Sequence, residues 1–155
     1  MALSRTAWQT AITDVSTSAQ YALGTLREFQ NPTFGPQVWR YVKNGEAATN
    51  FVIGNGVMQE NGLDKYECVQ SGAVANVRFM GVAQHAIAFG SYGFVLADGV
   101  GLHLSGGAGT TANTVQIGAA AGTFTDGTAV TSEGIVFANA AAAAAATFQG
   151  YIRAL

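Results

Sequence analysis

GVAQHAIAFGSYGFVLADG, residues 81–99, is the part of this chain that predicts its architecture most directly. Two short apolar runs flank the turn pair Gly90-Ser91, and the second run alternates between two faces. One face carries Tyr92, Phe94 and Leu96, and the other carries Gly93, Val95 and Ala97. The pair Asp98-Gly99 tolerates positive φ and is expected to end this strand in a turn. The stretch therefore predicts a β-meander built for packing, with no polar group placed for chemistry.

The second half of the chain is almost uncharged. Residues 99–152 contain the acids Asp126 and Glu133 and neither lysine nor arginine. Charged residues make up 10% of the whole chain, whereas soluble domains commonly have about a quarter. We therefore expect part of the surface of residues 99–146 to be buried against other protein.

Length and composition favour one folded domain without a catalytic or nucleic-acid-binding signature. The chain has 155 residues, of which 49% are hydrophobic, and its net charge is −2. Such a chain is long enough to bury a core, and its charge gives no attraction to nucleic acid or to anionic membranes. No secretion signal and no membrane-spanning run is visible, so synthesis in a cytoplasm is expected.

The pattern of turns divides the chain into an arm, residues 1–20, and a single β domain, residues 21–155. The arm is polar and rich in Ser and Thr, with Trp8 as its large anchor. Residues 23–36 contain two glycines and two prolines and are expected to be irregular. Residues 37–43 alternate cleanly and predict a strand. Further strands are expected at 51–53, 65–70, 74–87 with a bulge at Gly81, 100–104, 114–117, 129–131, 134–137 and 147–154.

Turn signals recur about every 8–12 residues, which is typical of an all-β barrel or sandwich. The predicted fold class is therefore mainly β, a compact β-barrel-like or β-tulip-like domain with an extended N-terminal arm. Residues 138–146 are alanine except for Asn139. A helix this short is marginal in water, so this tract is expected to form a compact loop or a short helix.

The residues with chemical potential do not form a recognisable site. His85 and His103 lack a nearby carboxylate cluster, which makes a metal site a weak hypothesis. The lone Cys68 is expected to be a small buried residue in a strand. Ser91 is interpreted as a turn serine, because its surroundings differ from the Gly-x-Ser-x-Gly elbow of hydrolases. No catalytic, cofactor-binding or metal-binding residue is predicted, and no cofactor.

Three other motifs favour ordinary structural roles. Glu60, Asp64 and Glu67 cluster in sequence but are expected on a solvated hairpin surface. The glycines of residues 106–109 lack the lysine of a phosphate-binding loop and indicate a hairpin loop. The aromatic residues lack interleaved Lys or Arg, which argues against a nucleic-acid platform. A structural role, not an enzymatic one, is therefore the leading expectation.

Three segments resemble the small decoration (cement) proteins of tailed-bacteriophage heads. They are the pattern MGVA…IAFGSYGFV…G over residues 80–99, the strand WRYVK at 39–43 and the closing GYIRAL at 150–155. The resemblance spans roughly residues 20–155. Residues 26–36 resemble an insertion relative to that family, and the alanine tract is unusually long.

The resemblance implies a structural virion protein that decorates and stabilises the outer surface of the capsid. It implies the major capsid protein as the partner and a homo-oligomer, with a trimer favoured. Two alternatives stay open. One is another virion component, such as a tail or head fibre. The other is a carbohydrate- or receptor-binding module that uses Trp8, Trp39, Tyr41 or Tyr92 as a stacking platform, although these aromatic residues are more simply interpreted as core or interface anchors.

Overall fold

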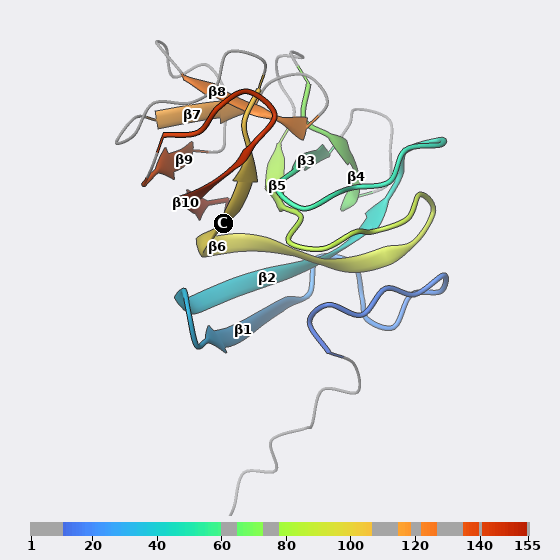
Figure 1. Cartoon of the computed structure of the whole chain (residues 1–155). Helices are drawn as coiled ribbons and strands as arrows, with labels where there is room; N and C mark the ends of the chain where they lie inside the picture. Colours follow the sequence, from blue (N-terminus) through green and yellow to red (C-terminus); the bar gives the residue numbers. More distant parts are fainter. Residues whose placement is uncertain are drawn as a thin grey trace, which may run out of the picture.

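The computed structural model describes residues 11–59, 65–72, 78–106, 115–118, 122–126, 135–139 and 141–154 (Figure 1). These residues form ten β-strands and no α-helix, which confirms the mainly-β fold class. The strands are β1 (Leu26–Asn31), β2 (Gly35–Asn44), β3 (Gly56–Gln59), β4 (Glu67–Gln70), β5 (Phe79–Val82), β6 (Tyr92–Leu104), β7 (Val115–Gly118), β8 (Phe124–Asp126), β9 (Ile135–Ala138) and β10 (Thr147–Arg153). In this described part, no helix has the length and apolar character needed to cross a membrane.

Five of the strands close into a ring of hydrogen-bonded neighbours. The order is β2–β4–β3–β5–β6, and β6 pairs back with β2. The pairings are antiparallel except that of β2 with β4, which run parallel where Lys43 and Asn44 face Glu67 and Cys68. Closure gives each of these strands a partner on both sides, which removes exposed strand edges.

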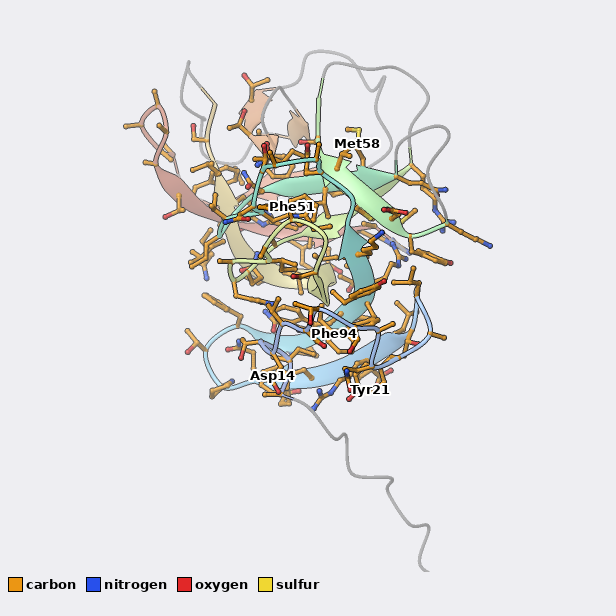
Figure 2. The ribbon with its side chains drawn as sticks, turned by 90° about the vertical axis from the view of Figure 1, so that its right-hand side faces the viewer. Asp14, Tyr21, Phe51, Met58 and Phe94 are labelled. Carbon is orange, nitrogen blue, oxygen red and sulfur yellow. The ribbon has the colours of Figure 1, made fainter. Side chains whose placement is uncertain are left out.

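The inside of the ring is a small apolar core. Each ring strand contributes one buried side chain to it: Val42, Val57, Cys68, Met80 and Val95. Phe51, Ala83 and Ile87 complete the cluster from segments that flank the strands. Figure 2 shows Phe51 within the body of the fold. The strands converge on this core because alternate residues of each strand point to its inner side.

A second, larger core forms on the other faces of β2 and β6. Trp39, Tyr41, Phe94 and Leu96 belong to it, which confirms the two-faced alternation predicted for residues 92–97. The strands β10, β9, β7 and β8 extend the sheet from β6, and β8, β9 and β10 add four more large side chains to this core. These are Phe124, Val136, Phe148 and Ile152. The two cores share strands, so the ring and its extension fold around common elements.

The turn expected at Asp98-Gly99 is wrong, because β6 continues through these residues to Leu104. The strand changes partner here: Asp98 pairs with Val38 of β2 and also with Arg153 of β10. The pairing with β2 shifts register at this point, as in a bulge. Gly99 has a φ of 117°, and a Cβ there would lie 2.9 Å from the carbonyl oxygen of Pro36. The glycine therefore lets the strand bend between two partners instead of ending it.

The irregular structure expected for residues 23–36 is also partly wrong, because residues 26–31 form β1. Pro32 and the adjacent residues lie in the hairpin turn between β1 and β2. The side-chain oxygen of Asn31 accepts hydrogen bonds from the backbone N–H groups of Thr33 (2.8 Å) and Phe34 (3.0 Å). Asn31 and Pro32 thus help to form a turn between two strands.

Most of the other expected strands overlap observed ones. The expected strands at 37–43, 65–70, 100–104, 114–117, 134–137 and 147–154 overlap β2, β4, the end of β6, β7, β9 and β10. The expected strand at 74–87 overlaps β5, and its bulge at Gly81 is confirmed: Val57 pairs with Gly81, and Met58 pairs with Phe79. Residues 51–53 form only a bridge between Phe51 and Ile87. Strands β3 and β8 were not predicted, and residues 129–131 lie outside the described residues.

The described part of the expected arm, residues 11–20, packs on the domain. Ile12 is buried in the larger core. Ser16 and Tyr92 exchange two backbone hydrogen bonds, of 3.1 and 2.8 Å. Residues 1–10, including Trp8, lie outside the described residues. The division between arm and domain at residue 20 stays a prediction.

The described part of the alanine tract is a turn and not a helix. The backbone N–H of Ala146 donates to the carbonyl oxygen of Ala143 at 3.2 Å, and Ala145 has a φ of 57°. The expected compact loop is therefore found over residues 141–146. The end of β6 anchors the turn, since the N–H of Ser105 donates to the carbonyl oxygen of Ala146 at 2.9 Å.

Candidate interaction surface

The two histidines lie in separate, mostly apolar surroundings. The ring of His85 stacks beside that of Trp39, with 6.4 Å between the ring centroids. Neither ring nitrogen of His85 has a hydrogen-bond partner among the described residues. Burial lowers the pKa of His85, and the Asp14 carboxylate opposes this effect. A neutral imidazole in such a place serves packing better than metal binding.

His103 is fully buried between β6 and β10. Its Nε2 lies 3.0 Å from the carbonyl oxygen of Gly150, and within the described part of the chain its Nδ1 has no partner. The rings of Phe124 and Phe148 each lie 5.4 Å from the imidazole, centroid to centroid. Burial lowers the pKa of His103 to about 4. The side chain is thus neutral at pH 7, and the carbonyl oxygen of Gly150 favours the tautomer protonated at Nε2.

Cys68 and Ser91 occupy structural positions. Cys68 is a buried strand residue in the ring core, as expected, and burial raises the pKa of its thiol to about 12. The Cys68 side chain is therefore a poor nucleophile at neutral pH. Ser91 lies in a turn, where its backbone N–H donates to the carbonyl oxygen of Ala88 at 3.1 Å.

The expected acidic hairpin is described only in part. Glu67 forms an ion pair of 2.7 Å with Lys43 across the parallel strands β2 and β4. Glu60 and Asp64 lie outside the described residues, as do residues 107–109 of the glycine-rich loop. Among the described side chains, no group of three or more His, Cys, Asp or Glu could hold a metal ion.

The aromatic residues weighed as a stacking platform are mostly interior. Trp39 and Tyr41 are buried members of the larger core, which confirms their interpretation as core anchors. Tyr92 is partly buried and stacks on Tyr41, with 6.3 Å between ring centroids. Trp8 lies outside the described residues. Sugar stacking needs an open ring face, which Trp39 and Tyr41 do not offer.

An uncharged face does form where β6 and β10 lie side by side (Figure 1). Val100, Leu102 and Leu104 of β6 are partly exposed there. Their partners across the strand pair are the exposed residues Tyr151, Gln149 and Thr147. Directly paired residues project from the same side of a sheet, so these six side chains form one patch.

Charge is confined to one end of this patch. Asp98 and Arg153 pair there, and the hydroxyl of Tyr151 donates to Asp98 at 3.2 Å. At the other end lies the alanine turn, in which Ala141, Ala143, Ala144 and Ala145 are exposed. We call the six strand residues and the turn at 141–146 the uncharged face. The contribution of β10 to it was not predicted, although the alternation of residues 147–153 places Tyr151 on the outer side.

No protein-family model matches this chain, and no curated protein matches it either. A solved structure does match: the N base of the head fibre protein gp8.5 of bacteriophage phi29. The two structures superimpose with a TM-score of 0.54 and share 12% sequence identity. The match covers 75% of this chain and 93% of that one. The two chains therefore have a similar fold.

Proposed function

We propose that this chain is a structural protein of a tailed-phage virion, which binds the outer surface of the head and stabilises the shell. The observation that carries this proposal is the fold that the chain shares with the N base of a phage head fibre. The sequence resemblance to capsid decoration proteins supports the same location. On this proposal the partner is the major capsid protein, and the protein acts as a homo-oligomer, with a trimer favoured.

The uncharged face is the surface that we assign to protein contacts. Burying a charged side chain without a partner costs roughly several kcal/mol of free energy. Burying an alanine side chain costs little, because it has almost no rotamer entropy to lose. Val100, Leu102 and Leu104 are already partly buried, and the alanine turn lets another backbone approach closely. This face therefore suits a contact with the shell or between copies of the chain.

The proposal assigns no catalysis to the protein. Among the described candidates, Cys68 and His103 are buried and Glu67 is paired with Lys43. Each of them has a structural role that accounts for its position. A turnover measured with the purified protein, and lost in a correctly folded variant, would contradict this assignment.

A second candidate function is the base of a fibre on the phage head. The match to the phi29 head fibre base favours it, because that base is the part of the fibre protein with the similar fold. Both candidates place the chain on the head. They differ in whether binding strengthens the shell.

The test uses shells assembled from the major capsid protein encoded in the same genome, prepared without this chain. Purified protein is added, and occupancy is measured by cryo-imaging and by sedimentation. We expect regular binding on the outer surface and a rise in the temperature at which the shells come apart. Regular binding with an unchanged disassembly temperature would favour the fibre base. Absence of binding would overturn both candidates.

A further inference from the structure

A second exposed surface lies at the ends of two neighbouring loops. Residues 47–53 lie in the connection between β2 and β3, and residues 86–90 lie in the connection between β5 and β6. Both loops project on the right-hand side of Figure 1 and face the viewer in Figure 2. Phe51 and Ile87 join them through two backbone hydrogen bonds, of 3.0 and 3.1 Å. The loops therefore form one structural unit.

This unit exposes large apolar side chains. Val52 is 47% exposed, Ile53 45% and Phe89 53%. In the same two loops, Ala47, Ala48, Ala86 and Ala88 are also exposed. Residues 47–59 and 79–97 contain no Asp, Glu, Lys or Arg. We call Val52, Ile53, Phe89 and these four alanines the apolar tip.

Three asparagines hold the two loops in place. The amide nitrogen of the buried Asn44 donates to the carbonyl oxygens of Thr49 (3.0 Å) and Ile87 (2.9 Å), one in each loop. The side-chain oxygen of Asn55 accepts from the N–H of Val52 at 2.8 Å. That of Asn50 accepts from the N–H of Phe89 at 3.0 Å, again between the loops.

A fixed, uncharged and apolar tip is suited to binding. Large exposed apolar side chains would gain stabilising free energy if a partner covered them and removed them from water. Exposed apolar patches on soluble proteins commonly mark interaction sites. Loops that are already held in one conformation lose less entropy when they bind. The asparagine hydrogen bonds thus prepare the tip for a partner.

We propose that the apolar tip inserts into an uncharged apolar groove on the major capsid protein of the shell. The inference rests on the proposed function and names a contact of that function. The tip carries no positive charge for nucleic acid or anionic lipid. Its partner surface must lack charge too, because an unpaired charge facing Phe89 would be desolvated.

The size of the tip favours a shell over a second copy of the chain. A stable interface uses roughly 20–30 residues from each partner, and the two loops together supply far fewer. A weak contact suffices on a shell, because an oligomer that binds several sites at once gains from effective concentration. The apolar tip is therefore a supplementary contact beside the uncharged face.

The test replaces exposed apolar side chains and leaves the core intact. The double variant Val52→Ser/Phe89→Ser is compared with Val15→Ser/Leu26→Ser, whose side chains are 40% and 48% exposed and lie outside the two loops. The probe is the shell described above. We expect the tip variant to bind the shell at least about tenfold more weakly than the parent, as for the loss of an interface hot spot. We expect the control variant to bind like the parent.

The outcomes separate this inference from the proposed function. If the parent binds and the tip variant binds equally well, the tip inference is overturned while the function stands. If the parent does not bind, both are overturned. If the tip variant changes the oligomer size without shells, the tip belongs to a contact between copies, and the inference is again overturned.

A second pair of variants tests the role of the loop hydrogen bonds. Asn50→Ala removes the acceptor for Phe89 and keeps every apolar side chain of the tip. Asn31→Ala is the control, because Asn31 makes similar hydrogen bonds in the turn between β1 and β2. We expect Asn50→Ala to bind the shell severalfold more weakly than the parent. We expect Asn31→Ala to bind the shell like the parent. Equal binding by the two variants would contradict preparation of the tip by Asn50.

Discussion

The buried imidazole of His103 is expected to make the folded state sensitive to acid. His103 has a pKa of about 4 in the folded chain, against about 6.5 when unfolded. Its Nδ1 makes no hydrogen bond to any residue that the structure describes, so a proton there would place an unpaired charge beside Phe124 and Phe148. The folded state therefore binds this proton less readily than the unfolded state does.

We predict that this imbalance lowers stability between pH 6.5 and pH 4. Because the folded pKa is depressed, the contribution of His103 is fully present above pH 6.5 and is lost as the pH falls towards 4. At pH 4.5 the loss amounts to about 2–3 kcal/mol. Urea unfolding at pH 7.5 and pH 4.5 measures it. His103→Gln keeps a donor for Gly150 and should show a smaller acid-induced loss; an equal loss would assign the effect to other groups.

Among the elements, β6 determines how the two cores are connected. Its first half pairs with β2, and its second half pairs with β10. The bend at Gly99 makes both pairings possible. A strand that ended at Asp98 would separate the ring from its extension.

We predict that Gly99→Ala is much more destabilising than Gly35→Ala. Both glycines have positive φ, of 117° and 79°. A Cβ at Gly99 would meet the carbonyl oxygen of Pro36 at 2.9 Å, whereas a Cβ at Gly35 would have no atom of the described residues within 4 Å. We expect a loss of about 1 kcal/mol for Gly35→Ala and about 3 kcal/mol or more for Gly99→Ala. Thermal and urea unfolding measure both, and equal losses would argue against the bend.

We predict that a charge in the alanine turn weakens binding to the shell or association between copies of the chain. Ala144→Lys places an ammonium group on the uncharged face, and Ala22→Lys places one on an exposed position outside that face. Both variants should fold, because both alanines are exposed. Only Ala144→Lys should reduce shell occupancy or oligomer size, since a buried lysine is costly without a partner. If Ala144→Lys assembles like Ala22→Lys, the alanine turn is not part of a contact.

The sequence predicted the faces of individual strands better than it predicted how the strands pair. Alternation identified the faces of residues 92–97, and Trp39 and Tyr41 were correctly interpreted as core anchors. The bend at Gly99 was missed because an Asp-Gly pair serves a turn and a bulged strand equally well. The ring itself depends on a parallel pairing of only Lys43 and Asn44 with Glu67 and Cys68, which leaves no local pattern. The apolar tip was missed because apolar residues between Asn50 and Asn55 resemble a weak strand.

In the molecule as a whole, residues 11–20 are part of the folded domain, so they affect its stability as well as its proposed binding to the shell. Ile12 lies in the larger core, and Ser16 extends the pairing of Tyr92. Removal of residues 1–20 therefore affects two properties at once, the stability of the domain and its binding.

We predict that the two properties separate in a pair of truncations. Removal of residues 1–20 should lower the free energy of unfolding by about 1.5–3 kcal/mol through the loss of Ile12 alone. Removal of residues 1–10 keeps Ile12 and Ser16 and should leave the free energy of unfolding nearly unchanged. Shell binding of the shorter truncation then reports the contribution of residues 1–10 to assembly. A large loss of stability in that variant would instead indicate that residues 1–10 belong to the fold.

The position of Asn44 has a consequence for genetic screens. This buried side chain ties the end of β2 to both loops of the apolar tip, and the Asn44 backbone also bonds to Gly90 and Ser91. On our assignment, a selection for particles that fail to gain the protein would return substitutions at Asn44 together with those at Phe89. Such mutations would then include substitutions of Asn44, a buried residue that does not contact the shell. They would act indirectly, by changing the conformation of the two loops.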